Sequence, residues 1–231
     1  MTAVGEFPRF RAVADHAVLA EFGEVLGSDA YGEVMRLDSL LAAAPFAGFA
    51  EAVPAYVSLL VEFDPLLTDH VAVEQALRAL LEGSPVAPTE GRRHVVDVCY
   101  DADFAPDLPA VAAAAGIEPE AAIAAHLAGD YRVFMYGFAP GYAYLAGVPE
   151  TLRRPRKPSA IRDIAAGSVL IAGAQCLVST LKMPTGWWII GRSPTRILID
   201  EPDRPFLFDV GDTVTFRRID RAEFSSAAEG G

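Results

Sequence analysis

The stretch from Phe134 to Pro194 decides the fold class: FMYGFAPGYAYLAGVPETLRRPRKPSAIRDIAAGSVLIAGAQCLVSTLKMPTGWWIIGRSP. It is rich in glycine and proline, yet apolar and aromatic residues stand between them. A disordered linker would lack those apolar residues because it has no core to build, and a regular helix does not tolerate so many backbone breakers. The stretch therefore predicts short strands joined by tight loops, and such loops on a rigid scaffold are where binding residues concentrate.

Strand-like segments dominate the chain after residue 140. They are short, apolar and closely spaced, which is typical of a small barrel or sandwich. We expect a β-barrel domain over residues 139–222 and a disordered tail at residues 223–231. The predicted strands are SVLIAG (168–173), CLVST (176–180), WWIIG (187–191), TRILI (195–199) and TVTFRRI (213–219).

The chain before residue 138 mixes helix and strand signals, which predicts an α+β domain over residues 1–138. Helical spacing of apolar residues, followed by proline or glycine, predicts helices at 28–44, 68–81 (with Thr68 as cap), 106–115 and 119–128. Strands are predicted at 10–13 and 18–22 as a hairpin, on both sides of Pro54, at 94–100 and at 131–138.

The charge balance limits the possible partners. The 231 residues carry a formal net charge of −12, which argues against nucleic acid and against stable association with an anionic membrane. One group of cations runs against this balance: Arg153, Arg154, Arg156, Lys157 and Arg162. This group is either a solvated basic loop or a site for an anionic ligand or an acidic partner surface.

The cysteine count and the N-terminus indicate a cytoplasmic protein. The chain has 2 cysteines, Cys99 and Cys176, and no CxxC pair, so no disulfide scaffold is expected. Residues 1–23 place charges and a proline where a signal peptide needs an apolar run. No window approaches the ~20 apolar residues of a membrane span. No cluster with the spacing of metal ligands stands out.

Seven sequence blocks and two single residues carry a family resemblance. They are DHAVLAEFG (15–23), VPAYVSLLVEFDP (53–65), VCYDADFAPDLPAVAAAAGI (98–117), GFAPGYAYLAG (137–147), AGSVLIAG (166–173), PTGWWIIGRSP (184–194) and GDTVTF (211–216), with His126 and Gln175. In this order they resemble the family of the B-type 5-oxoprolinase subunit, allophanate hydrolase subunit 1 and the sporulation-kinase inhibitor. The same unit occurs in the carboxyltransferase region of urea carboxylase.

The resemblance implies a fold, a reaction and partners. The implied fold is an α+β N-terminal domain followed by a cyclophilin-like β-barrel. The implied activity is ATP-dependent opening of 5-oxoproline or hydrolysis of another small amide or urea-like molecule. The active site would be shared with a homologous second subunit, namely the C-type 5-oxoprolinase subunit or allophanate hydrolase subunit 2, joined by a third oxoprolinase subunit.

Two alternatives remain open within the family. One is a regulatory protein that inhibits a histidine kinase, and the other is a carboxyltransferase component whose biotin belongs to another protein. The chain departs from the common family pattern at Ala160-Ile161, at Cys176 to Thr180 and at Met183 to Thr185, which leaves the substrate open. The resemblance implies ATP as a co-substrate of the complex. GxxxxGK[ST] and GxGxxG are both absent, so this chain is not expected to bind ATP through either motif.

Three polar residues are predicted to be catalytic. His126 titrates near neutral pH and is a candidate for proton transfer, the alternative being a helix C-terminal histidine bonded to backbone. Gln175 offers a donor and an acceptor to a substrate amide or to barrel backbone. Arg192 is placed to hold a carboxylate or phosphate, the alternative being an arginine bonded to loop carbonyls. Cys176 is interpreted as a packing residue, since no base is paired with it in the sequence.

Seven further residues are predicted to shape a substrate pocket. Pro140-Gly141 predicts a type II turn that presents backbone N–H groups to a ligand, with Tyr142 and Tyr144 stacking on the ligand or hydrogen-bonding it. The alternative is a turn that links domains and has packed aromatic residues. Two aromatic residues, Trp187 and Trp188, begin a strand and should point to opposite faces. The predicted substrate-binding residues are Phe138, Pro140, Gly141, Tyr142, Gly167, Ser168 and Trp187.

Overall fold

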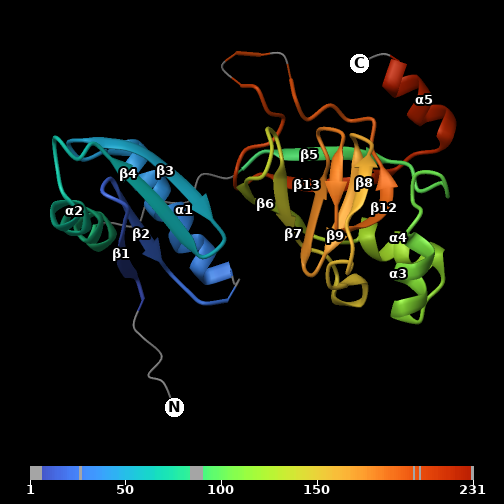
Figure 1. The fold of residues 1–231 in the computed structure, drawn as a ribbon, viewed down its shortest axis with the longest axis horizontal. Helices are drawn as coiled ribbons and strands as arrows, with labels where there is room; N and C mark the ends of the chain where they lie inside the picture. The colour runs from blue at the N-terminus through green and yellow to red at the C-terminus, as the bar shows by residue number, and fades with distance from the viewer. Residues whose placement is uncertain (1–6, 26–27, 84–90, 200, 203, 230–231) are drawn as a thin grey trace. The chain divides into compact units, whose positions relative to one another are not determined.

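The computed structural model describes residues 7–25, 28–83, 91–199, 201–202 and 204–229, and it confirms a mixed α+β fold (Figure 1). The chain divides into two compact units, unit 1 (Met1–Glu90) and unit 2 (Gly91–Gly231). Each unit has its own large sheet and its own buried apolar cluster. Each unit therefore has its secondary structure packed around a core of its own.

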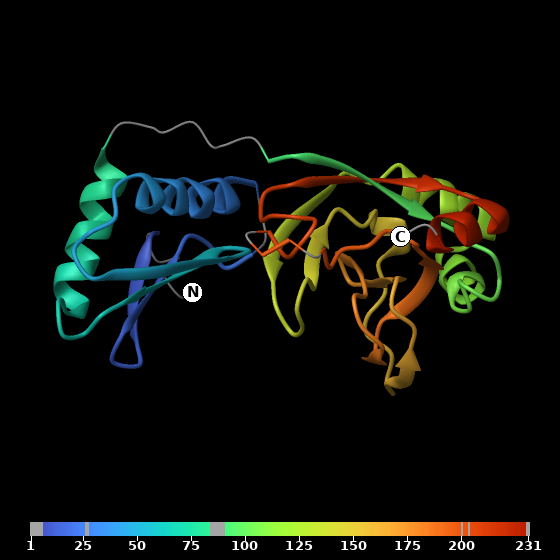
Figure 2. The same cartoon turned by 90° about the horizontal axis from the view of Figure 1, so that it is seen from above.

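Unit 1 is a four-stranded antiparallel sheet that packs against two helices (Figure 2). Alternate residues of β4, namely Leu59, Val61 and Phe63, are buried, as expected for a sheet with one covered face. They meet the fully buried Leu37 and Leu77 of the two helices. The elements are β1 (Arg9–Val13), β2 (Ala17–Glu21), α1 (Ser28–Ala43), β3 (Phe49–Ala55), β4 (Ser58–Phe63) and α2 (His70–Glu82), in the sheet order β1-β2-β4-β3.

Two details of unit 1 differ from the prediction. Pro54 lies inside β3 and the turn follows at residues 56–57, because β3 is an edge strand, where a missing N–H is tolerated. Helix α2 is capped by Asp69, whose carboxylate accepts a hydrogen bond from the Ala72 amide at 2.9 Å. Aspartate is a stronger N-cap than the predicted Thr68.

Unit 2 is built around a seven-stranded sheet of order β12-β9-β10-β7-β6-β13-β5. Neighbouring strands are antiparallel, apart from the parallel pair β5 and β13. Its strands are β5 (Arg93–Val98), β6 (Tyr131–Tyr136), β7 (Ala143–Ala146), β9 (Ser168–Ala172), β10 (Gln175–Val178), β12 (Trp188–Arg192) and β13 (Thr213–Arg218).

The two outer strands of this sheet meet at one point. Cys99, directly after β5, forms an antiparallel bridge with Arg192 at the end of β12, with N···O distances of 2.8 and 2.9 Å. The bridge turns the sheet into a nearly closed barrel, which removes exposed sheet edges. Val133, Ile171 and Phe216 from three of its strands lie in the buried core.

The domain boundary expected at 138/139 falls inside this barrel. Strand β6 lies before residue 138 but pairs with β7 and β13, which follow it. Strand β5 likewise pairs with β13 along its whole length. Strands on both sides of residue 138 thus share one sheet, and the units separate at 90/91 instead. Residues 84–90 lie outside the described part of the chain.

Two helices of unit 2 match the prediction closely. They are α3 (Leu108–Ala115) and α4 (Pro119–Leu127), and Gly116 ends α3 with a left-handed φ of 69°, a conformation that glycine adopts without strain. In the described part of the chain no single helix is long and apolar enough to cross a membrane, and the pair α3–α4, bent by 93°, meets that test only by combined length and composition.

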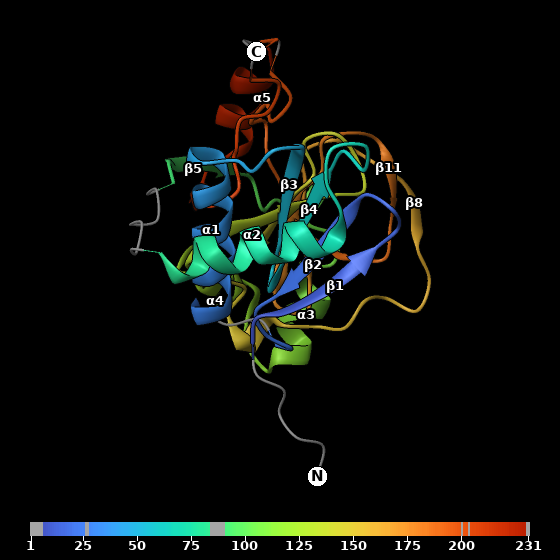
Figure 3. The same ribbon diagram turned by 90° about the vertical axis from the view of Figure 1, so that its left-hand side faces the viewer.

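A small two-stranded ribbon stands beside the barrel sheet (Figure 3). It consists of β8 (Ile161–Ile164) and β11 (Met183–Thr185), and a 3₁₀ turn, η1 (Glu150–Leu152), precedes it in the chain. The strand predicted at residues 195–199 is reduced to a single bridge between Leu198 and Phe206. Within the described residues, this segment pairs with no strand of several residues.

The end of the chain is a helix rather than the disordered tail predicted at residues 223–231. Helix α5 (Arg221–Glu229) is fixed by Arg221, which pairs with Asp101 and Asp103 at 3.2 and 2.9 Å. The Phe224 ring packs on Phe104 with centroids 4.5 Å apart. One ring contact and two ion pairs therefore order a polar segment; residues 230–231 lie outside the described part.

Candidate functional site

A polar pocket of about 260 Å³ lies in unit 2 where β9 begins and β10 and β12 end. Its wall combines glycine, hydroxyl side chains and one arginine. The lining residues are Ala166, Gly167, Ser179, Thr180, Ser193 and the segment 194–198, which includes Thr195 and Arg196. A pocket of this size with convergent polar groups suits a small polar molecule.

Gly167 and Ser193 bring two walls of the pocket into contact. The Ser193 amide donates to the Gly167 carbonyl at 2.8 Å, and the Gly167 amide donates to the Ser179 carbonyl at 2.7 Å. Gly167 has a φ of +80°, and a Cβ at this position would lie 2.3 Å from the Ser193 carbonyl oxygen. Only glycine fits this approach, which explains the residue type at this point of the wall; the role of Gly167 in substrate binding stays a prediction.

Buried hydroxyl groups hold the same wall from inside. The Ser179 hydroxyl accepts from the Ser168 amide at 2.9 Å and donates to the Ala165 carbonyl at 2.9 Å. The Ser168 hydroxyl donates to the same carbonyl at 2.8 Å. Since both serines are buried, these bonds satisfy groups that would otherwise destabilise the loop. Ser168 therefore lies behind the wall and does not line the pocket itself.

The predicted turn at Pro140-Gly141 forms and borders the pocket. The Tyr142 amide donates to the Ala139 carbonyl at 3.1 Å, and Gly141 at the third position has a φ of +68°, as a type II turn requires. Thr180 donates its hydroxyl to the Pro140 carbonyl at 2.8 Å. A Cβ on Gly141 would lie 2.7 Å from Leu198, so turn and pocket wall touch.

Four aromatic rings continue from this turn across the outside of the barrel sheet. Successive ring centroids from Phe138 through Tyr142 and Tyr144 to Trp187 are 5.4, 5.8 and 5.8 Å apart. Burial raises the pKa of Tyr142 to about 12, so it stays protonated and able to donate. Phe138 is 74% exposed and has a positive φ of 72°, a strained state for a residue with a Cβ.

The two tryptophans point to opposite faces, as predicted. Trp187 belongs to the outer cluster with Tyr142, while Trp188 packs against the barrel core. The Trp188 indole donates to the Pro155 carbonyl at 2.8 Å, and Arg156 lies 5.7 Å from the Trp187 ring centroid. Trp187 is thus a mostly buried ring at the end of this row, and it does not line the polar pocket.

Most of the basic group at residues 153–162 braces the structure. Arg153 donates to the Val148 carbonyl at 2.9 Å, and Arg154 donates to the Arg153 carbonyl at 2.6 Å. Lys157 pairs with the half-buried Asp107 at 2.5 Å. Three of the five cations therefore have internal partners, which fits neither the freely solvated loop nor a dedicated anion site.

His126 lies in the core of unit 2, away from the pocket. It is 1% exposed, its Nδ1 is 2.8 Å from the Tyr100 hydroxyl, and its Nε2 is 3.7 Å from Cys176 Sγ. Burial lowers the pKa of His126 to about 3 and raises that of the Cys176 thiol. Both groups are neutral at pH 7 and closed to solvent, so this geometry favours packing for His126 over proton transfer to a substrate.

Gln175 is not brought to the pocket either. It starts β10 beside the hairpin turn at Gly173, where it pairs with Ala172 and Ala146. Ser179, after the other end of β10, lines the pocket. A strand separates them, and at roughly 3.3 Å per residue the two positions are too far apart to contact one small ligand.

Arg192 stands at the border of the pocket. Its backbone closes the barrel with Cys99, and its Cγ would lie 3.8 Å from a Cβ on Gly167. Its guanidinium carbon is 5.3 Å from the Phe104 ring centroid. The structure therefore places Arg192 beside Gly167, while Gly141 lies against the pocket residues Thr180 and Leu198.

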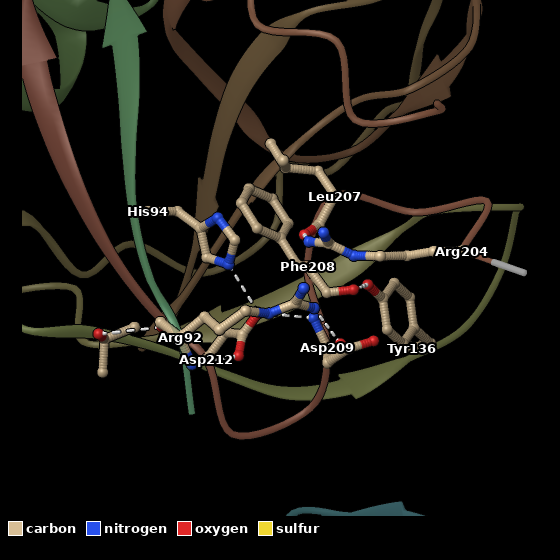
Figure 4. Close-up of polar contacts among 9 residues, drawn as sticks. Arg92, His94, Tyr136, Arg204, Leu207, Phe208, Asp209 and Asp212 are labelled. Carbon is tan, nitrogen blue, oxygen red and sulfur yellow. Dashed lines mark hydrogen bonds and ion pairs between the residues drawn. The ribbon is translucent and has the colours of Figure 1, made fainter. Parts of the chain in front are cut away.

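A second polar cluster in unit 2 centres on the buried Asp212 (Figure 4). Its carboxylate accepts from the Arg92 amide at 2.7 Å, from His94 Nε2 at 2.7 Å and from the Asp209 amide at 2.8 Å. Arg92 also pairs with Asp209, and Tyr136 donates to the Phe208 carbonyl at 2.5 Å. The cluster ties the start of unit 2 to the turn before β13.

Sequence reasoning missed several pocket residues, namely Ser179, Thr180, Ser193, Thr195 and Arg196. The available signal was the run of hydroxyl residues at strand ends, in Ser179-Thr180 and in Ser193-Pro194-Thr195. The His94–Asp212 pair was missed because its members are 118 positions apart. Among the described residues, no group of three or more His, Cys, Asp or Glu side chains is arranged to hold a metal ion.

The chain belongs to the family described as carboxyltransferase domain, subdomain C and D, which it matches over residues 8–208. It is 34% identical to the B-type 5-oxoprolinase subunit of Bacillus subtilis (strain 168) over 232 residues, which cover 94% of this chain and 95% of the relative. The family membership expected from the sequence blocks is thus confirmed.

Two solved structures extend the comparison. TTHA0988 matches with a TM-score of 0.77 and 32% identity over 89% of this chain, which spans 40% of the TTHA0988 chain. The K. lactis urea amidolyase matches with a TM-score of 0.77 and 17% identity over 95% of this chain and 15% of its own. The second likeness shows a shared fold alone.

Proposed function

We propose that this chain is the B-type subunit of a heteromeric enzyme that opens 5-oxoproline by ATP-driven hydrolysis of its lactam C–N bond. The name of the B. subtilis relative supports the reaction. The observation that carries the proposal is the convergence of three loops of the family pattern, 137–141, 166–168 and 192–194, around one polar pocket. Such convergence of distant loops is typical of a binding site.

The pocket residues have roles that suit a small cyclic amide with a carboxylate. Ser193, Thr195 and Arg196 present polar groups to a carbonyl or a carboxylate. Phe138, which is 74% exposed next to the turn that borders the pocket, adds apolar surface, and the buried Tyr142 packs against its ring. We assign the remainder of the active site to a homologous second subunit of the C type. ATP is a substrate of the complex that another subunit binds.

Three finer assignments belong to this proposal. The barrel of unit 2 is of the cyclophilin-like kind, and its seven strands and bridge at Cys99–Arg192 support this. Unit 1 is the α+β partner of that barrel. The complex acts in the cytoplasm together with a third oxoprolinase subunit.

A carboxyltransferase component of a biotin-dependent system is the second candidate. The family description and the fold shared with the K. lactis urea amidolyase favour it. In that case the biotin is carried by another protein, and urea or a related amide accepts the carboxyl group.

Reconstitution separates these functions. The chain is co-expressed with its second and third subunits, and ATP hydrolysis and glutamate release are measured with 5-oxoproline, allophanate, urea and 2-pyrrolidinone. Turnover stimulated by 5-oxoproline supports the main proposal and names the substrate. A stable complex active only with urea and a carboxybiotin donor supports the second candidate. Absence of any complex rejects both and favours the kinase-inhibitor class.

A further inference from the structure

Arg192 carries a guanidinium group without an acceptor in the described chain. Its Nε is buried and has no hydrogen-bond partner there. None of the ion pairs found in the described residues involves Arg192, and its charge faces aromatic rings instead. A guanidinium has five N–H donors, so a partly buried one with unmet donors is a group arranged to receive an acceptor.

An aromatic pair fixes the orientation of this guanidinium. The Arg192 Cζ lies 5.3 Å from the Phe104 centroid and 5.8 Å from the Phe224 centroid, and the two rings are 4.5 Å apart. Phe104 comes from the segment after β5 and Phe224 from α5. Contacts of this kind hold a cation without using its hydrogen-bond donors, so the fork of Arg192 remains available.

The nearby carboxylates already have a cation. Asp101 and Asp103 pair with Arg221 at 3.2 and 2.9 Å, and Arg221 itself lies 4.1 Å from the Phe104 centroid. Arg192 is thus a second guanidinium against Phe104, and it has no ion pair of its own among the described residues. Such a charge attracts an oxyanion, because two planar N–H donors match the two oxygens of a carboxylate or phosphate.

The position of Arg192 links it to the pocket. Its neighbour Ser193 lines the pocket, and its side chain passes beside Gly167, which lines the same wall. We propose that Arg192, oriented by Phe104 and Phe224, forms an oxyanion subsite at the rim of this pocket. The inference rests on the proposed function in one respect, namely that the ligand is a small carboxylate-bearing amide. Helix α5 then belongs to the site, with Phe224 as a positioning residue.

Binding can be measured on the full-length chain through the arginine Nε–Hε signals in ¹H–¹⁵N spectra. The Arg192→Lys variant identifies the Arg192 signal by its loss. The protein is titrated with 5-oxoproline, with 2-pyrrolidinone, which has the same ring without the carboxylate, and with inorganic phosphate. We expect a saturable shift of the Arg192 signal with 5-oxoproline and none with 2-pyrrolidinone. The exposed, Asp97-paired Arg217 is the internal control and should not shift.

The variants test the role of α5. Phe224→Ala should weaken the affinity of the oxyanion about threefold, the magnitude of one exposed cation–π contact. Ser225→Ala, on the same helix, should leave the affinity unchanged. A saturable shift with phosphate alone keeps the oxyanion subsite and assigns it to a phosphate group. If no probe gives a saturable shift, the subsite is overturned. If Phe224→Ala and Ser225→Ala bind the oxyanion with equal affinity, the role of Phe224 is overturned.

These outcomes are independent of turnover. Oxyanion binding at Arg192 without 5-oxoproline turnover in the reconstituted complex would reject the proposed reaction and keep the subsite. Turnover of 5-oxoproline with an unshifted Arg192 signal would support the proposed reaction and reject the subsite.

Discussion

The amide of Ser193 donates to the carbonyl of Gly167 at 2.8 Å, and this bond joins the loop before β9 to the end of β12. A Cβ on Gly167 would lie 2.3 Å from the Ser193 carbonyl oxygen. The wall of the pocket thus depends on a backbone contact that only glycine permits. The substitution Gly167→Ala tests this dependence directly.

We expect Gly167→Ala to lower the free energy of unfolding of unit 2 by about 2–4 kcal/mol, from a strained left-handed φ together with the contact to Ser193. Gly173→Ala is the matched control, since Gly173 also has a positive φ, +55°, but nothing lies within 4 Å of its Cβ position. It should cost about 1 kcal/mol. Urea unfolding followed by tryptophan fluorescence reports on unit 2, where Trp187 and Trp188 lie. Equal losses in both variants would show that the close approach is unimportant.

Acid should destabilise unit 2 through His126. Its pKa is about 3 in the folded protein against 6.5 ordinarily, because burial disfavours the charged ring. Below pH 6.5 the unfolded chain takes up a proton that the folded chain refuses, so stability falls as pH falls from 6.5 towards 3. Between pH 6.5 and 5 this amounts to about 2 kcal/mol.

The measurement compares slopes rather than absolute stabilities. His126→Gln should be less stable at pH 7, but its stability should fall less steeply below pH 6.5. The difference in slope should correspond to at most one proton taken up on unfolding. The comparison is made by urea unfolding at several pH values. Identical slopes for the two proteins would contradict the assignment of a neutral, buried His126.

Asp212 should be essential to the stability of unit 2. Asp212→Ala leaves the Arg92 amide, the Asp209 amide and His94 Nε2 without their acceptor. We expect a loss of about 3–5 kcal/mol, as for other buried charges whose partner is removed. The control is Asp209→Ala, because its carboxylate is 65% exposed and exposed ion pairs contribute about 1 kcal/mol or less. A loss of similar size in both would show that burial does not decide the effect.

Phe138 should lower the stability of unit 2 and contribute to turnover. Its positive φ of 72° disfavours a residue with a Cβ, and its ring is 74% exposed. Phe138→Gly should therefore keep or raise the stability of unit 2, by up to about 1 kcal/mol, while weakening 5-oxoproline turnover of the complex. Ala14→Gly also relieves a positive φ, of 51°, in the hairpin of unit 1 and should leave turnover unchanged. Unchanged turnover in Phe138→Gly would remove Phe138 from the site.

The regular elements were predictable because their signals are local. Apolar spacing predicted α1, and Gly116 marked the end of α3; Pro140-Gly141 predicted its turn. The boundary between the units was not predictable in this way, because the pairing of β5 with β13 joins residues about 120 positions apart. Helix α5 was missed for a similar reason, since its order comes from Phe104, Asp101 and Asp103.

The candidate site was predictable only in part. Glycine and proline mark backbone geometry, so the special conformations at Gly141 and Gly167 could be predicted from the sequence. Polar residues reveal nothing of their burial, so His126 was expected at the site although it lies in the core. Cys176 had no base near it in the sequence, yet the fold places His126 Nε2 at 3.7 Å. Burial keeps both neutral, and the packing interpretation of Cys176 agrees with this.

Filling the pocket tests the central claim most directly. Thr195→Trp places a large side chain in the pocket, and Thr151→Trp places one on an exposed turn of the same unit. In the reconstituted complex we predict that Thr195→Trp reduces kcat/KM for 5-oxoproline at least about tenfold, roughly the effect of losing one favourable substrate contact, with the complex intact. Thr151→Trp should match the wild type. Wild-type turnover in Thr195→Trp would contradict the assignment of this pocket to the substrate.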